Sequence, residues 1–139
     1  MNARELGFNA IVAATGTIAS AWFGGWDIAL NALVTLMVLD YVTGFLGAVR
    51  LKKVNSEVMF WGGIRKCAIL AVVALAVLFD SMLGNSDPIL RTLTIYFYVA
   101  REGLSVTENF GIIGVPLPPG IKKVLEQLQE KGEDKNAND

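Results

Sequence analysis

The sequence predicts an all-α, polytopic membrane protein with four transmembrane helices, a cytoplasmic loop at the membrane interface and a short amphipathic C-terminal helix. Three observations carry this prediction. The 139 residues are 53% hydrophobic, with a mean hydropathy of +0.48. Apolar runs with few charges, each about as long as a bilayer crossing, recur along the chain. The basic residues gather between these runs, at alternate connections.

Four segments are long and apolar enough to cross a bilayer: residues 6–26, 28–49, 67–83 and 88–115. The first carries no charge, the second only Asp40 and the third only Asp80. Residues 19–21, Ala-Ser-Ala, also fit the small-x-small pattern of a signal-peptide cleavage site, and cleavage would leave three spans. Residues 1–115 are therefore predicted to form a membrane domain, followed by a cytoplasmic tail over residues 116–139.

The distribution of basic residues predicts the orientation. Except for Arg91 and Arg101, every lysine and arginine precedes the first span, lies between the second and third, or follows the fourth. The positive-inside rule then places both termini and the central loop in the cytoplasm. The basic residues predicted to lie at the membrane surface are Arg50, Lys52, Lys53, Arg65 and Lys66.

Small residues follow one face of the first span and one face of the second. Such a face lets a second helix approach closely, within the molecule or between copies, and packing within the molecule is favoured for the first span. The predicted helix-packing residues are Ala13, Gly16, Ser20, Gly44 and Gly47.

The central loop, residues 50–66, is basic at both ends and apolar in the middle. Ser56 is predicted to cap a short helix carrying Phe60 and Trp61, which Gly62 and Gly63 can end. This segment is predicted to lie on the cytoplasmic leaflet, held by its apolar side chains and by attraction to anionic lipid. A solvated loop is the alternative.

Prolines after residue 115 stop the fourth span. Ile121, Val124, Leu125 and Leu128 then follow at the spacing of one helix face, which predicts an amphipathic helix over residues 119–131. The polar residues 132–139 are predicted to be disordered.

The fourth span carries charges that cannot face lipid, because each charge near the bilayer centre costs about 2.5–3.5 kcal/mol. Its polar residues recur at helical spacing on one stripe, with two more along the edge of the stripe. The stripe, which begins at Arg91, is predicted to face water or the polar groups of another helix. The intramembrane polar residues singled out as pore-lining or helix-contacting are Asp40, Asp80, Thr94, Tyr98, Arg101, Glu102, Ser105, Glu108 and Asn109.

Asp40 and Arg101 are predicted to lie at the same depth. Each follows the start of its helix at the outer face by 12 residues (28 to 40 and 89 to 101), or roughly 18 Å. We therefore predict that they pair, within or between subunits. The alternative is that each faces water in a permanent cavity. Asp80 is nearer the outer face and can extend toward it.

Composition argues against several classes. With Cys67 as the single cysteine and no histidine, the chain predicts no internal disulfide, no metal site and no cofactor. Glu102 and Glu108 have no accompanying nucleophile or phosphate loop, so an enzyme is the least favoured class. Nucleic-acid binding is not expected either, since topology explains the basic residues.

Several short motifs, taken in order, resemble the phage-lysis and toxin-secretion holin family. They are Asp40 with Gly44 and Ala48, a basic stretch leading to Asn55-Ser56, Gly-Gly-Ile-Arg-Lys at 62–66, Asp80, Arg-Glu-Gly-Leu-Ser-Val-Thr-Glu-Asn at 101–109, and Gly-Val-Pro-Leu-Pro at 114–118. Arg101 departs from the family pattern, in which a less charged residue is expected.

The resemblance implies a homo-oligomer of the bacterial inner membrane that opens lesions at a set time. An endolysin, or in some relatives a toxin, would pass as cargo, and an antiholin is a further partner. Two alternatives remain: a small ion channel or proton-coupled transporter, and an antiholin or membrane scaffold.

Overall fold

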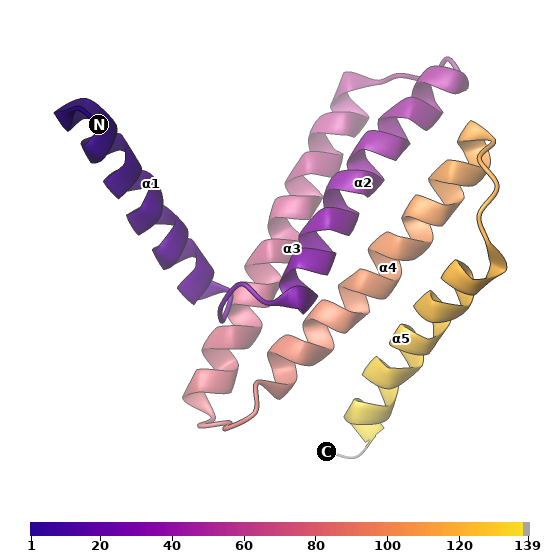
Figure 1. Cartoon of the computed structure of the whole chain (residues 1–139). Helices are drawn as coiled ribbons and strands as arrows, with labels where there is room; N and C mark the ends of the chain where they lie inside the picture. The colour runs from indigo at the N-terminus through magenta and orange to yellow at the C-terminus, as the bar shows by residue number, and fades with distance from the viewer. Residues whose placement is uncertain (138–139) are drawn as a thin grey trace.

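The computed structural model describes residues 1–137, except for the side chains of residues 125, 129 and 132–137. Over this range the chain forms helices joined by short connections, with no strand (Figure 1). The helices are α1 (Ala3–Trp22), α2 (Ile28–Arg50), α3 (Ser56–Met82), α4 (Ile89–Ile113) and α5 (Pro119–Ala137).

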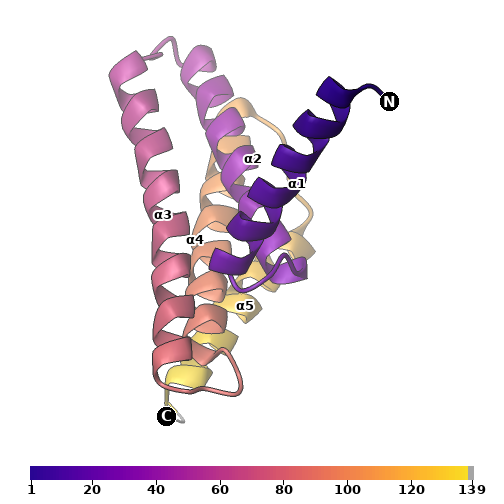
Figure 2. The ribbon, with the colours of Figure 1, turned by 90° about the vertical axis from the view of Figure 1, so that its left-hand side faces the viewer.

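Helices α2, α3 and α4 form the central bundle, in which α3 runs opposite to the other two (Figure 1). Figure 2 shows the same three helices side by side from a second direction. A small set of apolar side chains from all three helices makes the core: Leu30, Leu33, Met37, Val73, Ile95 and Val99.

Most of the apolar surface of the bundle faces outward. In α2 and α3 many large apolar side chains are exposed, among them Phe45 and Leu46 of α2 and Leu78 and Phe79 of α3. Soluble monomers rarely expose continuous apolar patches of this extent. The exposed faces are therefore suited to contact with lipid.

In the part of the chain that the structure describes, two helices, α2 and α3, are long and apolar enough to cross a membrane, with mean hydropathies of 1.8 and 2.0. Only 22% and 11% of their apolar windows are buried, whereas the core helix of a soluble protein is mostly buried. The prediction of four spans is therefore supported for two. Helix α4 carries four charged residues, and α1 is diluted by polar residues such as Asn9 and Thr15, so neither is a clear span by composition.

Helix α3 begins earlier than predicted and is continuous. Asn55, rather than Ser56, is its N-cap and accepts hydrogen bonds from the amides of Glu57 and Val58. The prediction that Gly62 and Gly63 end a short helix is wrong. Each costs about 1 kcal/mol in a helix interior, which the long apolar run that follows outweighs. The interfacial position of residues 50–66 stays a prediction.

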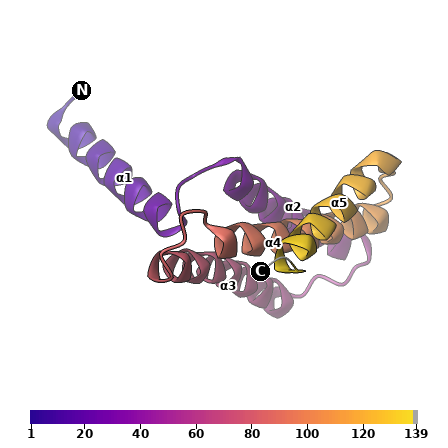
Figure 3. The ribbon, with the colours of Figure 1, turned by 90° about the horizontal axis from the view of Figure 1, so that it is seen from below.

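Helix α1 lies apart from the bundle. Among the described residues, it buries none of its own and contacts α3 alone, close to the hairpin that leads into α2. Figure 3 shows it directed away from the other helices. Ala13 and Gly16 are exposed and Ser20 is half-buried, and within the described chain no atom lies within 4 Å of a Cβ built on Gly16.

The small residues of α2 have a different environment, because α2 packs along α4. A Cβ built on Gly44 would lie 3.6 Å from Asn109 Nδ2, and one on Gly47 would lie 3.3 Å from Ile112 Cγ2. Both glycines thus lie at the contact between the two helices, where a larger side chain would separate them.

Helix α5 turns back along α4 (Figure 1). Leu128 packs against the core, whereas Ile121 and Val124 are exposed, and the side chain of Leu125 lies outside the described residues. The predicted disorder of residues 132–139 is wrong as far as Ala137, since the helix continues to that residue. The last two residues of that prediction lie outside the described chain.

Candidate functional site

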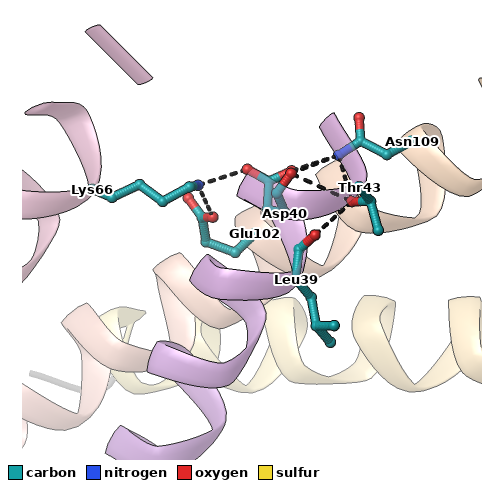
Figure 4. A network of polar contacts seen from close by, with 6 residues as sticks. All are labelled: Leu39, Asp40, Thr43, Lys66, Glu102 and Asn109. Atoms are coloured by element: carbon teal, nitrogen blue, oxygen red, sulfur yellow. Dashed lines mark hydrogen bonds and ion pairs between the residues drawn. The ribbon is translucent and has the colours of Figure 1, made fainter. Parts of the chain in front are cut away.

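An inner cluster of polar side chains joins α2, α3 and α4: Asp40, Thr43, Lys66, Glu102 and Asn109 (Figure 4). Lys66 Nζ of α3 lies 2.6 Å from Asp40 Oδ2 of α2 and also donates to Glu102 Oε2 of α4. The side chains of Lys66, Asp40 and Glu102 are only 17%, 16% and 8% exposed. One ammonium group therefore holds a carboxylate from each neighbouring helix, largely out of solvent.

Asn109 extends the cluster along α4. Its Nδ2 lies 2.9 Å from Asp40 Oδ1, 3.1 Å from the Asp40 carbonyl oxygen and 2.9 Å from Thr43 Oγ1 (Figure 4). Thr43 Oγ1 in turn donates to the Leu39 carbonyl oxygen at 2.6 Å. Within the described residues no buried side-chain nitrogen or oxygen lacks a hydrogen-bond partner. The cluster is thus satisfied in the closed bundle.

The inner cluster is unbalanced in charge, with one ammonium and two carboxylates. Removing one partner of a shielded ion pair is strongly destabilising, because it leaves the other charge uncompensated. Without Lys66, two carboxylates would face each other in a weakly solvated space. The integrity of the bundle therefore depends on this lysine.

The predicted pairing of Asp40 with Arg101 is wrong within the chain. Asp40 pairs with Lys66, while Arg101 is exposed and forms no ion pair in the described part of the chain. Glu102 precludes the predicted geometry: successive residues point about 100° apart on a helix, so α4 turns Glu102 inward and Arg101 away. Sequence reasoning placed Lys66 in the surface loop because the uncharged run begins at Cys67.

The other predicted residues of α4 lie mostly along one edge of the buried face. Thr94, Tyr98 and Ser105 are half-buried, and Glu108 is exposed. The face that α4 buries is largely apolar, and its two charged residues are Arg91 and Glu102. The whole face comprises Arg91, Ile95, Val99, Ala100, Glu102, Gly103 and Val106. The predicted stripe therefore packs only in part: Arg91 is buried and Tyr98 lies against the core, whereas Arg101 and Glu108 are exposed.

A second group, the outer cluster, lies at the opposite end of the bundle and comprises Asp27, Asp80, Asn85 and Arg91. Arg91 is only 5% exposed. Its guanidinium group makes two bonds to Asp27, of 2.7 and 3.1 Å, and donates to the carbonyl oxygens of Phe23 and Gly25. It therefore fastens the α1–α2 hairpin to α4.

Asp80 completes the outer cluster from α3. Its carboxylate accepts hydrogen bonds from the amides of Leu90 and Arg91, at 3.0 and 2.9 Å, and from Asn85 Nδ2 at 2.9 Å. Pro88, the N-cap of α4, makes no side-chain cap, so Asp80 replaces one and also complements the positive end of the helix dipole. The expectation that Asp80 extends toward the outer face stays a prediction; the side chain is buried against the start of α4.

Asp27 lies outside the apolar helices and caps α2 through the amide of Leu30. The hydrogen bonds from the Arg91 guanidinium, more than any other contact, hold the pKa of the Asp27 carboxyl below its ordinary value, whereas partial burial opposes this shift. Asp27 is therefore ionised, and attached to Arg91, at neutral pH.

Gly24 has a specific reason to be glycine. Its φ is +76°, and a Cβ built there would lie 2.7 Å from Arg91 Nε. The neighbouring Gly25 has a φ of +97°, but no atom lies within 4 Å of its built Cβ. Only glycine combines this backbone conformation with such a close approach by the arginine.

Exposed apolar helices and shielded polar clusters define a small all-helical membrane protein. The chain belongs to the bacteriophage holin family, whose family model matches residues 17–130.

Relatives agree with this assignment. A protein of Bacillus phage phi105 described as a probable holin is 32% identical over 122 residues, covering 88% of this chain and 90% of the relative. An uncharacterized 14.9 kDa protein of Clostridium perfringens is 38% identical, covering 86% and 91% of the two chains. The uncharacterized protein YqxH of Bacillus subtilis is also 38% identical, covering 84% and 83%. No solved structure matches the chain significantly.

Proposed function

We propose that this chain is a holin: it oligomerises in the bacterial inner membrane and opens lesions through which an endolysin, or a toxin, leaves the cytoplasm. Family membership and the phi105 relative support the holin role. The observation that carries the mechanism is the inner cluster, a shielded polar contact between three helices whose outer faces are apolar.

The closed bundle hides the inner cluster from lipid. Lys66 satisfies the carboxylates of Asp40 and Glu102, so a single chain can remain in the membrane without exposing these three charges. When helices separate, the same three groups can exchange their mutual contacts for water. A ring of copies that turns these groups toward a lumen supplies that water, and the protein acts by assembly rather than by catalysis.

The proposed topology places both termini and the α2–α3 connection in the cytoplasm. The positive-inside rule supports it through Arg50, the last residue of α2, and through Lys52 and Lys53 within this connection. The start of α1, residues 51–55 and the end of α4 lie at the same end of the molecule, as alternating crossings require (Figure 1). The outer cluster would then face the periplasm.

Membrane potential gives the assembly a trigger. A charge that moves across the whole potential gains or loses about 2.3 kcal/mol per 100 mV. Lys66 lies in the eleventh position of α3, about 15 Å from its first residue, so its charge lies within the membrane field if α3 spans. Depolarisation changes the energy of moving the charges of the inner cluster and thereby favours reorganisation.

The test is induction of this chain alone in a bacterium whose cytoplasm contains a muralytic enzyme without an export signal. Turbidity and membrane potential are followed together. Abrupt lysis after a delay, coincident with depolarisation, is the expected result. Depolarisation without lysis would indicate a small channel, and no effect on either would indicate an antiholin or scaffold; each outcome would contradict the proposal.

A further inference from the structure

A cleft of about 430 Å³ opens between α2, α3 and α4 beside the inner cluster. Lys53 of the α2–α3 connection, Arg65 of α3 and Arg101 of α4 contribute to its lining, together with Asp40, Lys66 and Glu102. The cleft therefore lies toward the α2–α3 connection and receives charged side chains from three parts of the fold. No part of the proposed lesion mechanism uses Lys53, Arg65 or Arg101.

The cleft has an excess of positive charge. Four cations against two carboxylates leave two positive charges in excess. Lys66 is engaged by both carboxylates, whereas Lys53, Arg65 and Arg101 are exposed and form no ion pair within the described chain. These three side chains are available to a ligand, and the ligand that balances them is an anion.

An apolar groove continues from the cleft. It has a volume of about 350 Å³ and is lined by Val34, Met37, Val38, Val42 and Leu70, with Gly63 at its α3 side. Tyr41 and Lys66 line both the groove and the cleft, so the two are neighbours that meet at these side chains. A ligand that fills both has an anionic group joined to an apolar chain.

We propose that the cleft binds the phosphate group of an acidic phospholipid and that the groove takes one of its acyl chains. Basic pockets between helices at the cytoplasmic side of a membrane suit acidic lipid headgroups. A free phosphate would satisfy the cations but leave the groove empty, which is why the structure favours a lipid. The proposal rests on the membrane location of the chain and not on lesion formation, so it can be tested without lysis.

The experiment measures binding of spin-labelled phosphatidylglycerol to the full chain in phosphatidylcholine vesicles. Arg65→Gln combined with Arg101→Gln is expected to weaken binding roughly thirtyfold, at about fivefold for each cation. Lys52→Gln combined with Lys122→Gln removes the same charge from exposed positions that do not line the cleft. This control pair is expected to bind almost as the native chain does. An equal loss in both pairs would overturn the proposal, since only general surface attraction would then be involved.

A second variant tests the groove without changing charge. Tyr41 Cε2 is the nearest atom to a Cβ built on Gly63, at 3.9 Å, so Gly63→Leu extends a side chain into the groove without a clash at Cβ. It is expected to reduce phosphatidylglycerol binding severalfold, whereas Gly16→Leu on exposed α1 leaves binding unchanged. Undiminished binding in Gly63→Leu, or displacement of the labelled lipid by inorganic phosphate alone, would overturn the assignment of a lipid.

Discussion

The two polar clusters differ in what their charged side chains bind. In the outer cluster, Arg91 donates to two main-chain carbonyl oxygens and Asp80 accepts from two main-chain amides. In the inner cluster, the Lys66 ammonium donates hydrogen bonds to the side chains of Asp40 and Glu102 and, within the described chain, to no main-chain group. Breaking the outer cluster therefore exposes buried backbone groups, which is costly. Breaking the inner one leaves every helix intact.

This difference assigns the clusters different roles. The outer cluster fixes the α1–α2 hairpin to the start of α4 and is suited to remain closed. The inner cluster can open by rotation of side chains and helices, because water can replace each of its contacts. The proposed lesion formation, in which a stable bundle later reorganises, needs both kinds of contact. Four experiments test the comparison, from the largest expected effect to the smallest.

Loss of Arg91 is expected to have the largest effect. Arg91→Met leaves two half-buried carbonyl oxygens without a donor and removes the counter-charge of the half-exposed Asp27, at about 3–4 kcal/mol after solvent screening of the ion pair. The variant should accumulate poorly in membranes and unfold at much lower temperature in detergent. Arg101→Met, on the exposed side of the same helix, should unfold like the native chain. Similar losses in both variants would mean that the outer cluster has no special role.

Loss of Lys66 is expected to destabilise the closed bundle by about 2–3 kcal/mol, less than a fully buried pair because water reaches the cluster in part. Lys66→Met should accumulate in the membrane yet shorten the delay before lysis, since Asp40 and Glu102 then repel each other. The triple variant with Asp40→Asn and Glu102→Gln removes that repulsion and should recover most of the delay. An unchanged delay in Lys66→Met would contradict the opening role of the inner cluster.

Gly24 and Gly25 form a matched pair within the hairpin. Gly24→Ala places a Cβ against Arg91 and also strains a backbone at positive φ, so a loss of about 2 kcal/mol is expected. Gly25→Ala meets only the backbone strain, at about 1 kcal/mol. Thermal unfolding of the two variants measures the difference. Equal losses would show that the close approach of Arg91 adds nothing.

Acidification is expected to have the smallest effect. The pKa of Asp27 is lowered below its ordinary value of 3.8 in the folded protein. The stabilisation it provides is therefore present in full above pH 3.8 and is lost as the pH falls through the lower, folded value. Unfolding midpoints of the native chain and of Asp27→Asn should converge at acidic pH and separate near neutrality. A constant difference across this range would show that the ion pair is not the source of the shift.

Part of this organisation is readable from the sequence. Apolar runs identify α2 and α3, and the small residues Gly44 and Gly47 occur where α2 meets α4. Depth along a helix can also be estimated from residue number. The angular position around the helix axis is harder to predict, because the sequence does not show which of two adjacent residues faces the neighbouring helix. The sequence therefore predicts that Arg101 faces α2, whereas in the structure Glu102 does.

The outer cluster was missed for a related reason. Asp27 and Arg91 are 64 residues apart, and no local pattern connects them. A usable signal did exist, since the predicted topology places Asp27 and Arg91, which have opposite charges, at the outer ends of the second and fourth spans. Asp80 was harder to interpret, because its role is to cap a helix from a different segment. Side chains that bind the backbone of a distant helix leave no periodic pattern in the sequence.

The detached position of α1 has a consequence for encounters between copies. A helix of 20 residues is about 30 Å long, and α1 contacts the bundle only near the hairpin. In a two-dimensional membrane, the number of copies per unit area at which neighbours first touch falls with the square of the radius over which each copy extends. A projecting α1 would therefore let copies meet while the membrane is still sparsely filled, and shortening it would postpone their first meeting until many more had been made.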